Sequence, residues 1–123
     1  MAEIKKKIEV ISNWLEYELE TDIIEPPVLK VRLSPLTDME YIESYDVPAG
    51  EIKPLTKIII SRILSAVNDW DLTLKGKKIQ VTEENKRKYL VILLGTKVKG
   101  KGKGLLGFEL LNYASNWDNF LKN

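Results

Sequence analysis

Two stretches in which apolar and charged residues alternate limit the folds open to this chain. Residues 13–20 are NWLEYELE and residues 27–36 are PVLKVRLSPL. In the middle of both stretches, every second side chain is apolar. A period of two is typical of a half-buried β-strand. The intervening TDIIEPP contains adjacent prolines, which cannot donate to a strand ladder. The pattern predicts a β-hairpin with an irregular loop, whose Glu and Lys/Arg side chains face each other on the solvated side.

The remaining chain has the apolar spacing of helices. Short helices are expected over 3–11 and from Thr37, where a capping box begins, to about residue 47. A central helix that is apolar on most sides is expected over 55–70. Thr82 is expected to cap a helix that Gly95 ends, and a last helix should fill 105–123. Strands followed by helices favour an α+β fold, with an N-terminal β-hairpin and then a small bundle of about four helices.

The 123 residues predict a single domain that can bury a core without disulfides or a metal. We divide 1–123 into an N-terminal helix and hairpin (1–36), central helices (37–94), a flexible basic loop (95–104) and a C-terminal helix (105–123). The loop contains TKVKGKGKG, in which Lys and Gly alternate, so we expect high mobility and few backbone hydrogen bonds there.

The composition argues against catalysis. Histidine and cysteine are both absent, which removes the commonest acid–base group, thiolate chemistry and the usual zinc ligands. Asp69 and Asp71 flank Trp70, but side chains two positions apart do not share a helix face, so we interpret them as a solvated helix end. Glu83 and Glu84 are interpreted as first-turn charges. We therefore predict no enzyme activity, no catalytic site, no metal and no cofactor.

Charge is distributed unevenly along the chain, although the net charge is only +1. Residues 1–52 hold 12 acidic and 5 basic side chains, whereas residues 75–103 hold 10 basic and 2 acidic ones. Such opposite lobes can steer an acidic partner or attract each other within the fold. Aromatic residues are missing between Tyr89 and Phe108, so a protein partner is favoured over nucleic acid. The N-terminus has no apolar run long enough for a signal peptide or a membrane span.

Two aromatic features have competing interpretations. Trp70 is expected to be buried in the core, where a structural junction forms between the central helix and the capped helix. The C-terminal stripe either closes the core, which the pattern alone favours, or offers an anchor to a partner. The junction residues are Trp70, Asp71, Leu72 and Thr82. The candidate partner-binding residues are Leu110, Tyr113, Trp117, Phe120 and Leu121, with Lys86, Arg87 and Lys88 as an electrostatic guide.

The junction sequence VNDWDLTLKGKKIQVTEENKRKYL, residues 67–90, resembles the core motif of phage tail assembly chaperones. In that family a helix runs into a W-[DN]-L-[TD] stretch, followed by a Gly turn, a short PVT-like segment and a TEEN helix start. LKVRLSPLTDMEYIE, residues 29–43, is similar to the family's transition from strand to first helix. Gln80 departs from the motif, because proline is common there. The matching residues are Trp70, Asp71, Leu72, Thr73, Gly76, Val81, Thr82, Glu83, Glu84 and Asn85.

The resemblance implies a non-catalytic binding role during assembly of a long phage or prophage tail. Such chaperones coat the tape measure protein, keep it soluble and recruit tail tube subunits. They act in the cytoplasm of the bacterial host and are generally absent from mature virions. We expect no membrane association, since no apolar run is long enough for a span, and self-association stays open. The alternatives are a basic nucleic-acid-binding accessory protein that uses residues 75–103, and a small structural tail protein of the virion.

Overall fold

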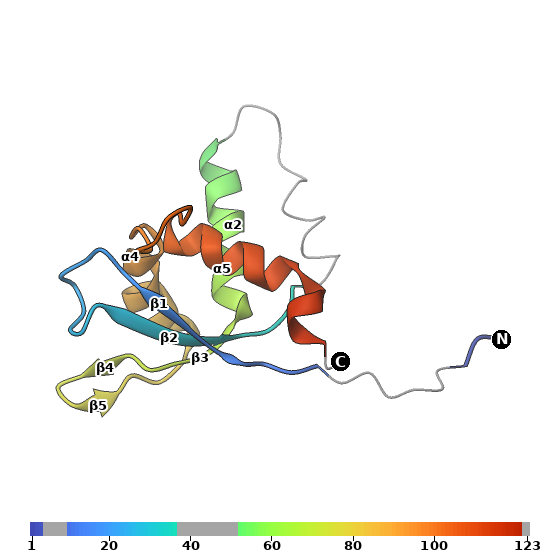
Figure 1. Ribbon diagram of the computed structural model, residues 1–123, viewed down its shortest axis with the longest axis horizontal. Coiled ribbons are helices and arrows are strands. Elements are labelled where there is room, and N and C mark those ends of the chain that lie inside the picture. The colour runs from blue at the N-terminus through green and yellow to red at the C-terminus, as the bar shows by residue number, and fades with distance from the viewer. Residues whose placement is uncertain (4–9, 37–51, 122–123) are drawn as a thin grey trace.

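The computed structural model describes residues 1–3, 10–36 and 52–121, with side chains of the central helix described from Ile59 onward (Figure 1). Residues 4–9 of the predicted N-terminal helix lie outside the described residues, as does the helix predicted from Thr37. The described part is a mixed α+β fold, in which helices cover one face of a small sheet.

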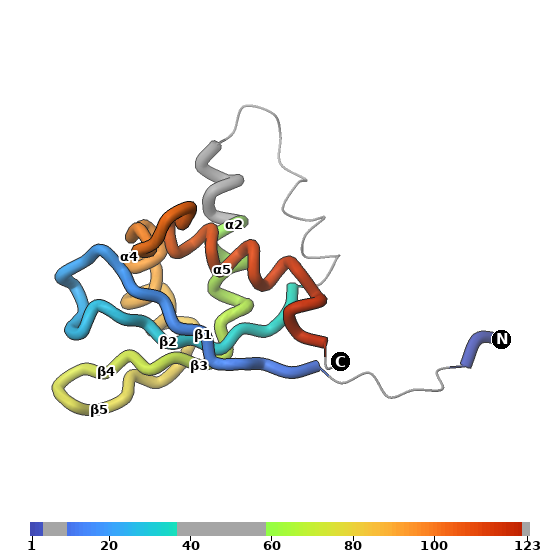
Figure 2. The backbone as a smooth tube through the Cα atoms, viewed as in Figure 1, coloured from blue at the N-terminus to red at the C-terminus, as the bar shows by residue number. Residues whose placement is uncertain are grey.

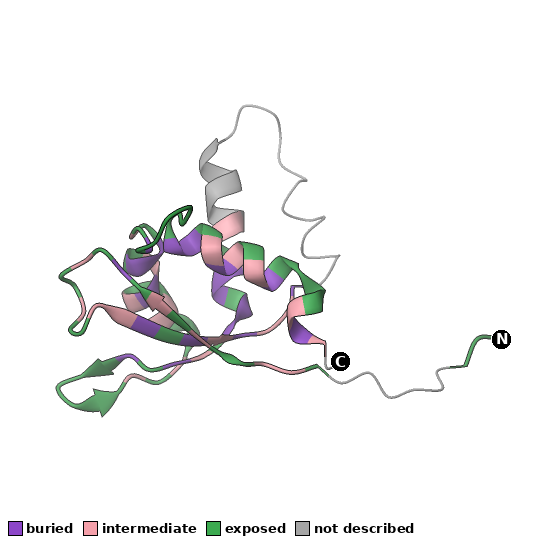
Figure 3. Cartoon of the chain, viewed as in Figure 1, coloured by how far each residue is buried: buried purple, intermediate pink, exposed green. Residues whose placement is uncertain are grey.

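The sheet contains the predicted hairpin. β1 (Trp14–Glu18) pairs antiparallel with β2 (Val28–Leu33), and β2 pairs antiparallel with β3 (Val67–Trp70), so β2 is central. Glu16 stands opposite Lys30, as the alternating pattern predicts for the outer face. On the inner face Leu29, Val31 and Leu33 are buried. Figure 3 shows this division, with buried residues between the sheet and the helices.

The helices of the described residues number three, where the sequence predicts about four. The first is α2 (Ile52–Ala66). The second runs over 83–94 and consists of α3 (Glu83–Asn85), a π-helical turn η1 (Lys86–Leu90) and α4 (Val91–Leu94). The third is α5 (Leu106–Ser115), followed by a 3-10 turn η2 (Trp117–Phe120). Thr82 caps the second helix as predicted, because its hydroxyl accepts the Asn85 N–H at 3.1 Å.

The central helix ends four residues earlier than the sequence predicts. It stops at Ala66, and the next four residues form β3, with Trp70 opposite Val31 and Asp69 opposite Arg32. Asn and Asp are weak helix formers, because their side chains compete for backbone groups. The free edge of β2 supplies partners for the backbone of these residues, and pairing there satisfies polar groups that would otherwise be buried unpaired.

Trp70 is fully buried, which confirms the predicted core position. Its indole N–H donates to the Ile79 carbonyl at 2.8 Å, and the Ile79 N–H donates to the Leu72 carbonyl at 2.9 Å. A small hairpin, β4 (Thr73–Leu74) and β5 (Lys77–Lys78), projects between these two points (Figure 2). The junction therefore brings the chain back to the core immediately before the Thr82 cap.

The basic loop is joined to the sheet, which corrects the prediction of few backbone hydrogen bonds. Val98 is buried and lies beside Leu19 in an antiparallel bridge. The Lys99 N–H donates to the Glu18 carbonyl at 2.8 Å, and the Glu20 N–H donates to the Lys97 carbonyl at 2.9 Å. The free edge of β1 and the apolar Val98 side chain explain the pairing. Residues 99–105 are exposed throughout, and Gly100 has a positive φ of 130° there.

The C-terminal segment is not one continuous helix. α5 ends at Ser115, and extended Asn116 turns the chain, with its side-chain oxygen accepting the Asp118 N–H at 3.1 Å. The 3-10 turn then places Phe120 in the core, edge to face with Tyr113 at 5.3 Å. Figure 2 shows the end of the chain beside the residues that precede β1, where the Ile11 N–H donates to the Phe120 carbonyl.

Removal of the Trp70 side chain should destabilise the whole domain. We expect Trp70→Ala to lower the free energy of unfolding by about 3–5 kcal/mol, the range for large aromatic deletions in cores. Trp70→Phe keeps a ring but loses the N–H donor to Ile79, so its loss should be smaller, about 1–3 kcal/mol. Urea denaturation measures both. Unchanged midpoint and slope for Trp70→Ala would show that the indole contributes nothing to the core.

The joined turn can be tested at Val98. Val98→Ala deletes two buried carbons and should lower the free energy of unfolding by about 2 kcal/mol. Lys101→Ala, at the exposed tip of the same turn, should change it by less than about 0.5 kcal/mol. If the two variants unfold at the same urea concentration, the turn does not contribute to the core in solution.

Candidate partner-binding surface

An apolar hollow of about 360 Å³ lies where α2, α4 and α5 meet. Its walls come from three helices and from both ends of the basic turn, so only the complete fold creates it. The described residues that line it are all apolar: Ile59, Ile60, Ile63, Val91, Leu94, Gly95, Leu105, Gly107 and Phe108. A depression with no polar lining side chain binds apolar groups rather than ions or polar metabolites.

Gly107 lets α5 approach α4 closely on the floor of the hollow. A Cβ at this position would lie 3.3 Å from the Leu94 carbonyl oxygen and 3.4 Å from the Leu94 Cβ. It would also lie 3.6 Å from the Ile63 side chain on α2. Because the tightest neighbour is backbone, a larger residue would push the two helices apart. The shape of the hollow therefore depends on this glycine.

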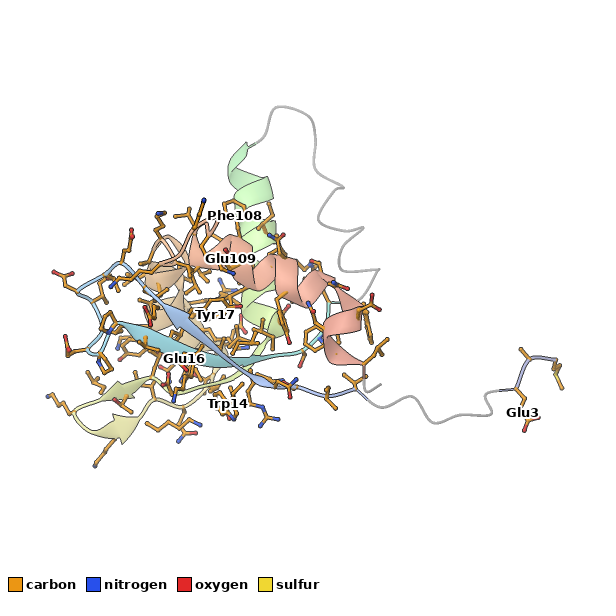
Figure 4. All side chains as sticks on the ribbon, viewed as in Figure 1. Glu3, Trp14, Glu16, Tyr17, Phe108 and Glu109 are labelled. Atoms are coloured by element: carbon orange, nitrogen blue, oxygen red, sulfur yellow. The ribbon has the colours of Figure 1, made fainter. Side chains whose placement is uncertain are left out.

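Large apolar side chains remain exposed at the rim of the hollow. Phe108 is 57% exposed and Leu105 is 40% exposed. Figure 4 shows Phe108 on the part of α5 that is far from the sheet, whereas Tyr17 lies on β1 below the helix. Exposed apolar residues that adjoin an apolar hollow make this area a candidate contact surface for another macromolecule. We call the hollow with Phe108 and Leu105 the α2–α5 surface.

The α2–α5 surface is bordered by positive charge. The basic turn leaves the hollow at Gly95 and returns to it at Leu105. The amino group of Lys97 lies 4.0 Å from a Glu20 carboxylate oxygen, which is a loose ion pair. Among the described residues, no carboxylate lies within ion-pair distance of Lys99, Lys101 or Lys103. These three amino groups are free to meet a partner.

Most of the predicted C-terminal stripe closes the core instead of forming a contact surface. Leu110 and Phe120 are each 1% exposed, so they lie in the core, as the favoured interpretation of the stripe predicts, and not on a contact surface. Tyr113 and Leu121 are half-buried. Trp117 is partly exposed, but its indole N–H is held by the Leu36 carbonyl at 2.8 Å. The bend at Asn116 explains this result, because it folds the end of the stripe back onto the domain.

Lys86, Arg87 and Lys88, which the sequence predicts to guide a partner electrostatically, have different structural roles. The Lys86 amino group donates to the Leu64 carbonyl in the last turn of α2 at 2.8 Å. Burial lowers the pKa of Lys86 below its ordinary value, and the Glu83 carboxylate partly opposes this. Arg87 pairs with Glu83 at 3.3 Å, and the Lys88 amino group lies 5.3 Å from the centre of the Tyr89 ring. Lys86 therefore joins two helices and is not a free surface charge.

The outer face of the sheet is a second, polar candidate. Two hollows of about 420 Å³ each share Glu16, Lys30 and Asp71. Nearby, the Arg32 guanidinium lies 5.6 Å from the centre of the Trp14 ring. This face carries both signs of charge on neighbouring strands, and charged side chains line both hollows. It is a weaker candidate for partner binding than the α2–α5 surface.

Asp69 and Asp71 are bonded to different parts of the sheet and the β4–β5 hairpin. They lie on and just after β3, not at the end of a helix as the sequence predicts. Asp69 accepts a hydrogen bond from the Lys78 amino group at 2.8 Å, and this bond lowers the pKa of the Asp69 carboxyl. Asp71 accepts the Lys30 N–H at 3.0 Å. Each carboxylate therefore has its own structural partner.

Tyr17 is the described side chain whose acidity changes most, and the change does not favour acid–base chemistry. Burial, with smaller contributions from Glu109 and Tyr113, raises the pKa of Tyr17 to about 12. Its hydroxyl therefore stays protonated near neutral pH. The described residues contain no group of three or more His, Cys, Asp or Glu side chains placed to hold a metal ion. Their helices also lack the combination of length and apolar character needed to span a bilayer.

Comparisons with protein-family models, with curated proteins and with solved structures found no match to this chain.

Gly107 and Phe108 are not among the partner-binding residues that the sequence predicts. The available signal is their position relative to the buried stripe of α5, which includes Leu106, Leu110 and Ala114. Phe108 lies two residues from the first two of these, so helical geometry turns it away from their face. An aromatic outside the buried stripe of an amphipathic helix indicates an exposed contact residue.

The structural role of Lys86 predicts a difference between neighbouring lysines. Lys86→Met keeps the aliphatic stem but removes the donor to Leu64, so the free energy of unfolding should fall by about 1–3 kcal/mol. Lys88→Met loses only an exposed cation–π contact and should change it by less than about 1 kcal/mol. Chemical denaturation of both variants provides the measurement. Equal stability of the two variants would return Lys86 to the group of free surface charges.

Proposed function

We propose that this chain is a non-catalytic phage tail assembly chaperone that binds the tape measure protein and helps to recruit tail tube subunits. The observation that carries the proposal is the α2–α5 surface, an apolar hollow with an exposed aromatic at its rim. The identity of the partners comes from the resemblance of residues 67–90 to the family motif. The same resemblance supports action in the host cytoplasm and absence from the mature virion.

A chaperone for a long helical protein needs apolar contact area more than an enclosed pocket. The hollow is at the small end of the range for ligand pockets, about 300–1,000 Å³. It is therefore suited to single large side chains projecting from a helix, as in recognition of amphipathic helices by hydrophobic grooves. Phe108 and Leu105 extend the apolar area beyond the hollow. Coverage of exposed apolar side chains would keep an aggregation-prone partner in solution.

We propose no enzymatic activity and no cofactor for this role. The chain has no His or Cys, and its most perturbed tyrosine is kept neutral. The hydrogen bonds of Asp69 and Asp71 hold the sheet and the β4–β5 hairpin, which gives each carboxylate a structural role. What remains on the surface is contact area and charge, which are the properties of a binding protein.

One observation favours the nucleic-acid alternative. Lys99, Lys101 and Lys103 are exposed on one turn and could contact phosphates. The apolar hollow beside them has no use in that alternative, since phosphate binding needs no apolar groove. Duplex DNA binding with a steep salt dependence would support the alternative. A structural protein of the virion would instead be retained in purified particles.

Co-expression with the tape measure protein of the same phage tests the proposal. We expect the chaperone to raise the soluble fraction of that protein several-fold and to co-purify with it. Phe108→Ala should lose most of this effect, because an exposed aromatic beside a hollow is a typical contact hot spot. Leu74→Ala is the matched control, since Leu74 is also exposed, at 53%, but lies on the β4–β5 hairpin outside the hollow.

Stability measurements separate binding from folding in this experiment. Both substitutions affect exposed side chains, so each should change the free energy of unfolding by less than about 1 kcal/mol. The proposal is wrong if the folded protein leaves the tape measure protein as insoluble as it is alone. If solubility rises but Phe108→Ala behaves like Leu74→Ala, the chaperone role stands and the contact surface lies elsewhere.

A further inference from the structure

We infer that the α2–α5 surface takes an acidic amphipathic helix, whose apolar side chains enter the hollow while its carboxylates meet Lys99, Lys101 and Lys103. The inference rests on the proposed function, in which this surface binds a protein. It adds the chemistry of the segment that is recognised.

The first support is that the basic turn is fixed at the edge of the hollow. Its two ends, Gly95 and Leu105, both line the hollow, and Lys97 and Leu105 form an antiparallel bridge. The Val98 N–H donates to the Gly104 carbonyl at 2.9 Å, and the Leu106 N–H donates to the Thr96 carbonyl at 2.8 Å. The lysines therefore project from a hydrogen-bonded base beside the apolar surface.

The second support is that the fold leaves the charge of this turn largely uncompensated. Val98 points into the core, so its neighbours Lys97 and Lys99 are directed to solvent by strand alternation. Only Lys97 has a carboxylate nearby among the described residues, at 4.0 Å. Glu109, the acidic residue closest in sequence, uses a carboxylate oxygen to accept the Gly104 N–H at 3.1 Å. Negative charges on a bound partner would be complementary to these exposed amino groups.

The combination of the two features selects the class of partner. The hollow is suited to large apolar side chains of a bound segment. The turn is suited to negative charges along one side of that same segment. Nucleic acid offers phosphates but no side chain that would fill an apolar hollow, and residues 95–104 contain no aromatic for base stacking. A lipid bilayer offers a flat surface, whereas this surface is concave. An amphipathic helix with acidic flanks meets both demands in one element.

Synthetic helical peptides test the inference directly. The probe is a labelled peptide of about 20 residues with Leu and Phe at helical spacing and Glu on its polar face. Matched peptides carry Gln or Lys in place of every Glu. By fluorescence anisotropy we expect the Glu peptide to bind roughly tenfold or more tightly than the Lys peptide, and its binding to weaken as salt screens the charges.

Two pairs of charge reversals locate the effect. Lys101→Glu with Lys103→Glu should weaken binding of the Glu peptide by roughly tenfold. Lys75→Glu with Lys77→Glu makes the same change in charge on the exposed β4–β5 hairpin, which lies across the sheet from the basic turn (Figure 1), and should leave binding nearly unchanged. Phe108→Ala should weaken binding of all peptides that carry Leu and Phe, whatever their charge.

The outcomes separate this inference from the proposed function. Equal binding of the Glu and Lys peptides, both weakened by Phe108→Ala, would overturn the acidic preference but retain the α2–α5 surface as a protein-binding site. No binding of the Glu peptide, or an equal effect of the two pairs of charge reversals, would also overturn the inference. It would be overturned as well if duplex DNA or phosphatidylglycerol vesicles bind through Lys101 and Lys103 while the Glu peptide does not.

Discussion

The burial of Trp70 against the central strand is the contact on which the arrangement of the helices depends. Its backbone pairs with β2 opposite Val31, and its indole N–H is bonded to the Ile79 carbonyl. These bonds fix the end of α2, which directly precedes β3, and the start of the Thr82-capped helix. The Lys86 amino group then ties that helix to the Leu64 carbonyl of α2. Two of the three walls of the apolar hollow are thereby positioned by one buried side chain and its neighbours.

The acidic and basic segments of the chain meet within the fold at one place. At another place, positive charge remains exposed. The acidic N-terminal half and the basic turn meet where Glu18 and Glu20 bond with Lys97 and Lys99 through their backbones. The side chains contribute only the loose Lys97–Glu20 pair. Because backbone pairing, rather than ion pairing, joins the turn to β1, the remaining lysines keep their charge exposed beside the α2–α5 surface. That uncompensated charge is the basis of the inferred preference for an acidic helix.

Several aromatic residues in the described part of the chain serve the core, and this limits where a partner can bind. Trp70 and Phe120 are fully buried, Tyr113 contacts Phe120, and the Trp117 indole is bonded to Leu36. Phe108 differs because it lies off the buried stripe of α5, next to a glycine that brings two helices together. In the proposed chaperone role, a surface built from helix walls and one exposed ring suits many apolar side chains without demanding a particular one.

The sequence by itself determined the elements that depend on neighbouring residues. The β1–β2 hairpin follows from period-two alternation, and the Thr82 cap follows from a hydroxyl placed three residues before an N–H donor. Burial of Trp70 also followed, since a Trp at the end of an apolar run has few alternatives. Only the tertiary structure decided that VNDW forms a strand, that Val98 joins β1 and that the C-terminal stripe bends at Asn116. Each of these depends on a partner distant in the chain, such as the free edge of β2 or β1, which local patterns do not encode. The apolar hollow is of the same kind, because it exists only where three helices from separate segments meet.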